Sequence, residues 1–398
     1  MTTAPSLSAR SIRYYDLDWL RVFATLAVFV YHAAKPFNFD AWHIRNAQLS
    51  PGLDSWAGFL GVWIMPILFV LSGMSIALSL RSRNAGQFAR QRVTRLLVPL
   101  VFGIFVLSPP QIYIERINYG QFDGSFFQFL PHYFNGPYLG YGKPGNFAWM
   151  GIHLWYLLLL FIYSIVLLPL FLAMRREAIQ ARLARLGACL EKPAALFLPA
   201  VPVMILSAAL DPSGPGLRIL GEWNVFIYLL LLVYGFVMMS ALGFEATVYR
   251  YRGLTFLVGL VAALITSPLD GAAYGTVGFF VGQAARGLLA WCLIVVLFGL
   301  FYLLRQRNTP FLRYTSEMVL PFYILHQPVI ILIGYYLVLP THFSPLAKYM
   351  LIIVMGLPVV VAIYELLVRR INLLRVLFGL KPLMRAGQRH TPAAEPYR

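Results

Sequence analysis

Long apolar stretches alternate with short polar segments along the whole chain. Ten of these stretches approach or exceed the roughly 17 residues that a helix needs to cross a bilayer. They cover residues 17–34, 57–80, 95–110, 150–173, 194–209, 223–242, 253–268, 276–304, 314–339 and 347–368. We therefore predict an all-α fold, a polytopic membrane helical bundle of about ten transmembrane helices. The fifth and seventh stretches are near the short limit, so nine or eleven spans also fit the pattern.

The composition supports a membrane protein, because 60% of the residues are hydrophobic, 12% are charged, and the mean hydropathy is +0.71. Ordinary soluble domains are far more polar. No internal repeat, separate soluble domain or signal peptide is apparent. The predicted organisation is a cytoplasmic N-terminal segment at residues 1–16, a transmembrane domain at 17–368 and a basic cytoplasmic tail at 369–398, with a disordered end from Gln388.

The net charge of +17 follows the predicted topology. If there are ten spans, the connecting segments alternate in side, and alternate segments hold 24 of the 32 Lys and Arg residues while the others hold 6. Cytoplasmic loops of membrane proteins carry such an excess. Both termini are therefore predicted to be cytoplasmic. The charge indicates topology and contact with anionic lipid headgroups, and it does not indicate a nucleic-acid surface.

The first apolar stretch carries a polar stripe. Asp18, Arg21, Thr25 and His32 fall within about 60° of one another on a helix, and roughly 16 Å of helix axis separates Arg21 from His32. Ionisable groups inside a membrane span are costly, so an aligned set is a functional candidate. The alternative is that Arg21 extends to the inner headgroups and His32 lies at the outer interface.

Several motifs in this order resemble the acyltransferase 3 family of integral membrane acyltransferases. The first is the Arg-x10-His spacing of Arg21 and His32. The others are Phe69-Val70-Leu71-Ser72-Gly73, Arg92-x-x-Arg95-Leu96-Leu97-Val98-Pro99, His153-Leu154-Trp155-Tyr156 and Tyr323-Ile324-Leu325-His326. The resemblance covers essentially the whole chain.

Within this family, the sequence resembles in particular the glucan biosynthesis protein C branch, which transfers succinyl groups to periplasmic glucans. The segments that carry this likeness are Trp42-His43-Ile44-Arg45-Asn46, His326-Gln327-Pro328, Tyr364-Glu365 and the stretch from Leu373 to Pro382. Two positions depart from the pattern. Gln327 stands where a second His is expected, and Leu68 stands where the first Phe of a Phe-Phe-x-Leu-Ser-Gly run is expected.

The resemblance implies a membrane-bound O-acyltransferase of the bacterial inner membrane. It would move an acetyl or succinyl group from a cytoplasmic acyl-CoA to hydroxyls of an extracytoplasmic glycan such as a glucan. The expected partners are the lipid bilayer, acyl-CoA as donor substrate and a carbohydrate acceptor. We expect no permanently bound cofactor, no metal and no nucleic acid, and the oligomeric state is open.

His32 is the expected base for the acceptor hydroxyl, because an imidazole titrates near neutrality. Covalent acyl-His32 is an alternative that the residues leave open. Asp18 would order Arg21, and Arg21 would bind the donor. Arg92 and Arg95 would hold the coenzyme phosphates, and the resemblance adds Ser72 to the donor site; the alternative for this arginine loop is positive-inside charge alone.

His153, Trp155 and Tyr156 are expected to orient the acceptor or to stabilise the oxyanion, and His326 to share the outer half of the bundle with His32. Trp42 and Arg45 are the other candidate substrate contacts. The segment 111–149 is rich in aromatic and amide side chains that suit a sugar, and its prolines argue against a regular helix. A membrane-interface belt is the alternative. Lys35, Arg45 and Arg218 are the cations available for a succinyl tail.

Two other classes of function compete with the enzyme. A secondary transporter would use the Asp, Arg and His set as an ion or proton relay, and a lipid-bound scaffold would need no chemistry. Motifs typical of an ATP-driven pump, a serine hydrolase or a zinc protease are missing. Cys189 and Cys292 are predicted in a cytoplasmic loop and a span, so a disulfide framework is not expected.

Overall fold

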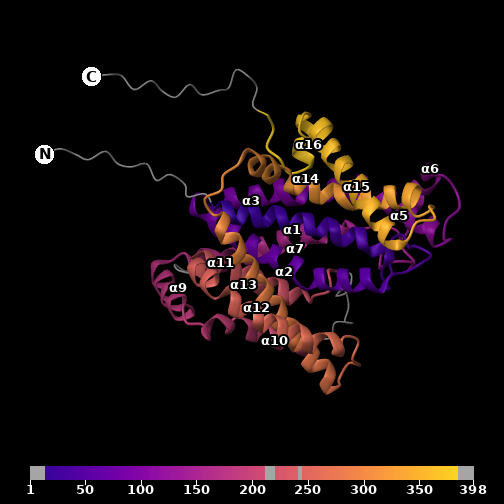
Figure 1. Ribbon diagram of the computed structural model, residues 1–398. Coiled ribbons are helices and arrows are strands. Elements are labelled where there is room, and N and C mark those ends of the chain that lie inside the picture. The colour runs from indigo at the N-terminus through magenta and orange to yellow at the C-terminus, as the bar shows by residue number, and fades with distance from the viewer. Residues whose placement is uncertain (1–13, 211–219, 241–243, 384–398) are drawn as a thin grey trace, which may run out of the picture. The chain divides into compact units, whose positions relative to one another are not determined.

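The computed structural model describes residues 14–210, 220–240 and 244–383, and these form helices joined by loops (Figure 1). No strand occurs among them, and one isolated bridge pairs Pro137 with Phe147. The chain divides into two compact units. Unit 1 comprises Met1–Ala27, Phe59–Leu78 and Phe171–Ser316, and unit 2 comprises Val28–Gly58, Ser79–Leu170 and Glu317–Arg398. The predicted disordered end from Gln388 lies outside the described residues.

Seven helices within the described ranges are long and apolar enough to cross a membrane. They are Tyr15–Phe37, Pro51–Arg81, Ala85–Asn118, Glu245–Leu269, Val277–Leu304, Pro310–Val338 and Pro345–Val368. An eighth span results if Ile152–Val166 and Leu168–Met174, which are bent by 55°, count as one. The fifth and sixth predicted stretches correspond to shorter apolar helices, Ala195–Ala209 and Val225–Met239. The all-helical membrane fold is therefore confirmed, whereas the count of ten stays a prediction.

Unit 1 is built from apolar helices and from parts of α1 and α2. Its elements are the start of α1 (Tyr15–Ala34), the middle of α2 (Pro51–Arg81), most of α8 (Leu168–Met174), α9 (Glu177–Leu190), α10 (Ala200–Ala209), α11 (Val225–Ser240), α12 (Phe244–Leu269), α13 (Val277–Phe301) and the start of α14 (Pro310–Ile333). Helices α12 and α13 form an antiparallel pair, since the loop between them is short.

Glycines bring two helices of unit 1 into backbone contact. A Cβ on Gly73 of α2 would lie 1.9 Å from the Leu232 carbonyl oxygen, and a Cβ on Gly235 of α11 would lie 1.9 Å from that of Val70. Small residues allow such close approach between membrane helices. The glycine of the Phe69–Gly73 motif therefore serves helix packing.

Unit 2 holds the remaining helices and the loop-rich segment. Its elements are the end of α1, both ends of α2, α3 (Ala85–Arg92), α4 (Val98–Phe102), α5 (Ser108–Asn118), α6 (Phe126–Phe129), α7 (Trp155–Val166), the rest of α14, α15 (Pro345–Ile363) and α16 (Asn372–Leu377). Four π-helical segments interrupt these helices at Val93–Leu97, Gly103–Leu107, Gly334–Val338 and Tyr364–Val368.

One prediction about this unit was wrong. The prolines of the segment 111–149 were expected to exclude a regular helix there, yet one helical segment runs from Ala85 to Asn118 and includes the start of that segment. A π-helical turn precedes Pro109 and Pro110, and the Ser108 amide donates to the Gly103 carbonyl. The wider turn re-arranges the hydrogen-bond ladder at the point where prolines cannot donate, so the helix continues.

The segment after α5 folds around its own small core. Ile112, Phe129, Tyr133 and Ala148 are buried together, and the Tyr133 hydroxyl donates to the Ile104 carbonyl at 2.7 Å. Burial raises the pKa of Tyr133 to about 12. In Figure 1, α6 and the end of α5 form one extremity of this unit. These aromatic residues therefore build a structured platform rather than only a membrane belt.

Candidate active site

Three histidines that are far apart in the sequence meet inside unit 2. His32 lies near the end of α1, His326 in the second half of α14, and His153 in the short turn Ile152–Leu154 before α7. The ring centroid of His326 is 4.9 Å from that of His32 and 5.2 Å from that of His153. His326 and His153 are 1% and 4% exposed, whereas His32 is partly exposed. Of the three histidines, only His32 therefore has appreciable exposed surface.

Hydrogen-bond partners assign the protons of the first two rings. His326 Nδ1 is 2.5 Å from the Tyr323 carbonyl oxygen, so it carries the hydrogen and leaves Nε2 as an acceptor. That Nε2 lies 3.0 Å from His32 Nδ1, which is also 3.0 Å from the Val28 carbonyl oxygen. A proton on His32 Nδ1 satisfies both acceptors. His32 Nε2 then carries a lone pair, and it has no partner among the residues that the structure describes.

A proline positions the third histidine. Pro328 has no amide hydrogen, so the Ile324 carbonyl four residues earlier lacks its helical partner. His153 Nε2 lies 3.1 Å from this oxygen and donates to it. The other ring nitrogen, Nδ1, is then an acceptor, and it is buried without a hydrogen-bond partner within the described structure. A buried polar atom of this kind costs about 1–3 kcal/mol unless a ligand or water satisfies it.

The remaining residues of the His153–Tyr156 motif divide between site and core. Leu154 and Trp155 are buried, and the Leu154 side chain fills the space beside Gly103. The Tyr156 ring lies 5.7 Å from that of Tyr323, whose hydroxyl donates to the His153 carbonyl. Tyr156 therefore reaches the edge of the histidine cluster, whereas Trp155 is part of the buried core.

A second buried polar network centres on Glu115, which the sequence analysis missed. Its carboxylate oxygen Oε2 lies 2.6 Å from His43 Nδ1 and accepts from the Tyr138 hydroxyl at 2.8 Å. Oε1 accepts from the Gly142 amide at 3.0 Å and lies 3.4 Å from Arg116. Both Glu115 and His43 are 0% exposed. Four contacts thus compensate a fully buried carboxylate.

Gln327 joins this network to the helix that carries His326. Its side-chain amide donates to His43 Nε2 at 3.2 Å and to Gln111 Oε1 at 3.1 Å. Gln111 in turn donates to the Leu107 carbonyl. A neutral histidine has a single N–H and could not make both donations. Gln327 can therefore make two hydrogen bonds at the position where the glucan biosynthesis protein C branch leads us to expect a histidine.

Trp42 and Arg45 flank this network. The Trp42 ring lies 6.3 Å from that of His32, with 29° between the planes, and its carbonyl accepts from the Tyr119 hydroxyl. Arg45 is exposed and lines a pocket of about 400 Å³. The other lining residues are Asn46, Ala47, Leu49, Asn118 and Tyr119. Trp42 therefore links this pocket to the histidine cluster.

Tyrosines around Glu115 are kept neutral by their surroundings. Burial and the nearby Glu115 carboxylate hold the pKa of Tyr138 well above its ordinary value, and the same causes raise the pKa of Tyr141. Burial and Glu115 also raise the pKa of Tyr119. Their hydroxyl groups therefore keep the proton at neutral pH, and those of Tyr138 and Tyr119 donate hydrogen bonds.

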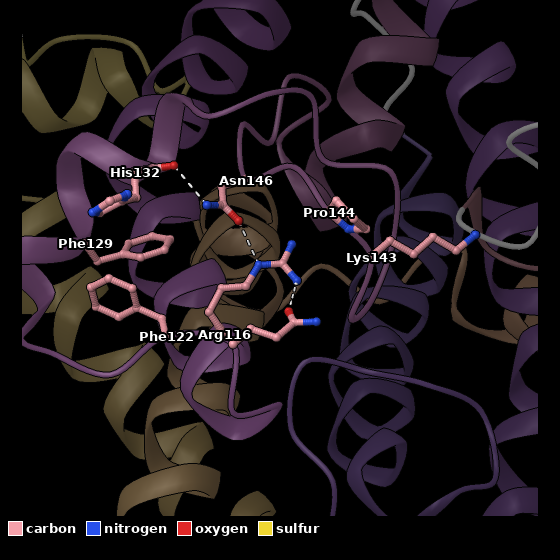
Figure 2. Close-up of a pocket in the computed structure, with 8 residues that line it drawn as sticks. Arg116, Phe122, Phe129, His132, Lys143, Pro144 and Asn146 are labelled. Carbon is pink, nitrogen blue, oxygen red and sulfur yellow. Dashed lines mark hydrogen bonds between the residues drawn. The ribbon is translucent and has the colours of Figure 1, made fainter.

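A second pocket of about 310 Å³ lies on the same segment (Figure 2). Figure 2 shows the Arg116 guanidinium at its centre, with the Phe122 and Phe129 rings on one side and Lys143 extending from the other. Arg116 donates to Asn146 Oδ1 at 2.7 Å and to the Gly145 carbonyl at 2.7 Å. The pocket wall is therefore held rigid by a buried cation.

Arg21 belongs to unit 1, and neighbours hold its guanidinium. It lies 3.1 Å from Asp18 Oδ1 and donates to the Ser75 hydroxyl at 2.8 Å. Ser75 stands two residues after the Phe69–Gly73 motif and was not among the predicted site residues. Ser72, which was predicted for the donor site, is half-buried. Thr25 is occupied locally, because its hydroxyl donates to the Arg21 carbonyl.

The arginines predicted for the donor phosphates lie at the start of the third span, in unit 2. The Arg92 guanidinium lies 4.5 Å from the centre of the Phe88 ring, and its Nε is buried without a partner in the described part of the chain. Arg95 donates to the Gly379 carbonyl. Arg92 forms no ion pair with a carboxylate among the described residues, so its charge is available to an anion.

Among the residues that the structure describes, no cluster of three or more His, Cys, Asp or Glu side chains could hold a metal ion. The structure does not bring together the three cations that were predicted for a succinyl tail. Lys35 pairs with Asp40 at 2.9 Å, Arg45 lines the larger pocket, and Arg218 lies outside the described residues. Glu115 and Gln111 could have been found from the sequence, because they stand four residues apart, and thus on one helix face, directly after the predicted third span.

Comparison with known families agrees with these motifs. The family model described as an acyltransferase domain, that of the acyltransferase 3 family, matches residues 14–365. The chain belongs to this family. It is therefore a multi-pass membrane acyltransferase, and this decides against the transporter and scaffold interpretations.

Curated relatives match over nearly their full length. Glucans biosynthesis protein C of Escherichia coli (strain K12) is 23% identical over 406 residues, which cover 96% of this chain and 98% of the relative. Glucans biosynthesis protein C of Salmonella typhimurium is 25% identical over 399 residues, which cover 95% of this chain and 98% of the relative. The resemblance to this branch is thus confirmed.

Proposed function

We propose that this acyltransferase moves an acetyl or succinyl group from a cytoplasmic acyl-CoA to a hydroxyl of a glycan on the opposite face of the membrane. The name of its relatives favours a glucan as acceptor. The observation that carries the proposal is the His32–His326 pair, because it leaves Nε2 unprotonated on His32, the one histidine of the three that is partly exposed.

The chemistry follows from that tautomer. His32 Nε2 takes the proton of the acceptor hydroxyl while its oxygen attacks the thioester carbonyl carbon. The carbon–sulfur bond then breaks, the coenzyme thiolate leaves, and the proton held by His32 returns to the sulfur. His326 accepts the hydrogen bond from His32 Nδ1 throughout, so it orients the base and stabilises the imidazolium. No permanently bound cofactor and no metal enter this scheme.

Arg21, ordered by Asp18, is proposed to bind the donor. An arginine has five N–H groups, and Asp18 and Ser75 engage only two of its nitrogens. Arg92 and Arg95 would add charge for the coenzyme phosphates, since guanidinium groups bind phosphate in a bidentate geometry. Ser72 belongs to this proposed donor site on the family motif alone.

His153, Tyr156, Trp42 and Arg45 are proposed to contact the acceptor. His153 Nδ1 offers an acceptor to a ligand hydroxyl, because its other nitrogen is engaged with Ile324. This supports a role in orienting the acceptor more than a role as oxyanion donor. Trp155 was predicted at the same site, and its burial favours a packing role there over direct contact with the acceptor.

The proposed topology has ten spans and two cytoplasmic termini. Seven long helices, the bent pair and the two shorter apolar helices make ten, and the excess of Lys and Arg in alternate segments supports this orientation. Helical spans suit the bacterial inner membrane, since outer-membrane proteins are β-barrels. The bilayer is then an obligatory partner, and nucleic acid is not.

A product assay tests the proposal. Purified protein in nanodiscs is mixed with isotope-labelled succinyl-CoA or acetyl-CoA and a glucan, and the glycan is analysed by mass spectrometry. We expect ester-linked label on glucan hydroxyls and release of free coenzyme in equal amount. Coenzyme release without labelled glycan would show a different acceptor, and the absence of both products with both donors would contradict the proposed function.

A further inference from the structure

The two pockets of unit 2 are neighbours on one segment. Asn118 and Tyr119 line the larger pocket, and Gln121 and Phe122 line the smaller one directly afterwards in the chain. The turn at Gly142 holds this stretch in place, because its carbonyl accepts from Gln121 at 2.6 Å. The Tyr119 ring packs against Gly142, where a Cβ would lie 3.2 Å from ring atoms. A single extended ligand could therefore contact both pockets.

The charge of these pockets is one-sided. Arg45 lines the larger pocket, and Arg116 and Lys143 line the smaller one, while no Asp or Glu lines either. Six Lys and Arg residues fall in the predicted outer segments or at their borders, so three of these six line two adjoining pockets. Positive charge is sparse on that side, and its concentration here calls for an anionic ligand.

Three other outer cations within the described residues are already engaged. Lys35 pairs with Asp40, Arg116 lies against Glu115, and buried Lys348 donates to Asn46 and to the Leu339 carbonyl. Arg45 and Lys143 differ, since both are exposed and neither has a carboxylate partner among the described residues. These two charges are therefore available to a ligand.

The remaining lining groups suit a sugar. The Asn118 side chain makes no hydrogen bond within the described structure, so its amide can donate to and accept from hydroxyl groups. Tyr119 and Phe122 present half-buried rings beside the cations. The larger pocket also adjoins the backbone of Trp42, whose ring faces His32.

We propose that the two pockets form one acceptor-binding surface for an oligosaccharide that carries a negative charge. This inference rests on the proposed function and adds the chemical class of the acceptor. The charged substituent would lie between Arg45 and Lys143, and a neighbouring sugar would extend along Trp42 toward His32.

Steady-state kinetics with two matched acceptors tests the inference. A glucose pentasaccharide and the same compound with one phosphate monoester are compared at low ionic strength and saturating acyl-CoA. We expect a KM about tenfold lower for the phosphorylated compound, and a difference that shrinks as salt screens the charges. Arg45→Gln and Lys143→Gln should each raise the KM for the phosphorylated compound roughly fivefold, more than for the neutral one.

The control is Lys192→Gln, which removes an exposed charge outside both pockets and should change neither KM. Equal KM values for the two acceptors in the unaltered protein would overturn the inference, as would a preference that survives in the Arg45→Gln and Lys143→Gln double variant. Calorimetric titration of His32→Ala protein measures binding without turnover. If His32→Ala protein binds the phosphorylated compound preferentially but the unaltered protein acylates neither compound, the proposed function is contradicted and this binding surface stands.

A lipid headgroup could offer the same negative charge. Nanodiscs of phosphatidylcholine and of phosphatidylglycerol separate the two ligands. We expect the preference for the phosphorylated pentasaccharide in both. If the double variant instead loses stabilisation by phosphatidylglycerol and binds the two saccharides like the unaltered protein, the surface belongs to lipid and the inference is wrong.

Discussion

The two ends of the polar stripe on α1 hold their polar groups in different ways. At the end of α1 that is predicted to be cytoplasmic, in unit 1, the Arg21 side chain is 31% exposed and is held by Asp18 and Ser75. Its other N–H groups can donate to a ligand. At the other end, in unit 2, His32 has its Nδ1 proton engaged and one lone pair open. The first arrangement suits binding of an anion, and the second suits transfer of a proton.

The surroundings of the two ends differ as well. In unit 1, Gly73 and Gly235 bring regular helices into backbone contact. All four π-helical segments in the described ranges lie in unit 2, as does Pro328, which frees the carbonyl that His153 uses. A membrane helix satisfies its backbone internally, so polar chemistry requires such interruptions. Unit 2 is therefore where buried polar side chains can be fixed.

The strongest test of this contrast is His32→Ala. Removing a general base should lower kcat roughly 10²- to 10⁴-fold while the protein still inserts and folds. Initial rates of label transfer to glucan measure the effect, and His342→Ala, at an exposed histidine outside the cluster, serves as control. Unchanged transfer by His32→Ala protein would remove the catalytic assignment.

Paired substitutions of His326 sharpen the proposed orientation of the base. Glutamine places its amide near the position of Nε2 and can still accept from His32, whereas asparagine places its amide near Nδ1 and keeps only the bond to Tyr323. We expect kcat to fall by about 10²-fold in His326→Asn and by only a fewfold in His326→Gln. Equal losses in both variants would mean that the contact with His32 has no role in catalysis.

Arg21→Ala tests the binding end. Loss of a hydrogen bond to a charged group costs about 1.5–3 kcal/mol, so the KM for acyl-CoA should rise roughly 10- to 100-fold with a smaller change in kcat. Arg182→Ala removes an exposed charge elsewhere and should leave the KM for acyl-CoA as it is. A fall in kcat with unchanged KM would erase the distinction between the two ends of α1.

His153 can be tested by the same pair of substitutions. His153→Gln keeps a donor near Ile324 and loses the acceptor at Nδ1, and His153→Asn does the reverse. If Nδ1 contacts the acceptor, His153→Gln should raise the acceptor KM by roughly tenfold at unchanged thermal stability. A normal acceptor KM in His153→Gln would reduce His153 to a structural partner of α14.

The smallest expected effect concerns Tyr138 and alkaline pH. Its folded pKa is raised, so its contribution to stability is complete below pH 10 and is lost as the pH rises from about 10 through the folded pKa. Tyr138→Phe should cost about 1–3 kcal/mol at pH 7, because Glu115 loses a buried donor, and should weaken the decline above pH 10. Thermal melts at pH 7 and above pH 10 measure the loss of stability at each pH, and Tyr274→Phe, at an exposed tyrosine, serves as control. A melt that matches the control at pH 7 would contradict the assigned hydrogen bond.

Sequence alone determined the helical membrane class, the helices themselves and the candidate residues of α1. Periodicity and apolar length are local properties, and a bilayer requires internally bonded helices, so the ten stretches correspond to helices in the structure. It also singled out His32, His153 and His326 as separate candidates. The spacing of Arg21 and His32 was readable because both lie on one helix.

Only the tertiary structure decided which side chains meet and which protons they carry. The contact between His32 and His326 joins residues 294 positions apart, and that between Gln327 and His43 joins residues 284 apart. No local periodicity encodes such pairs, because they depend on how helices pack. The open lone pair of His32, the carbonyl freed by Pro328 and the network of Glu115 appear only when these distant segments are folded together.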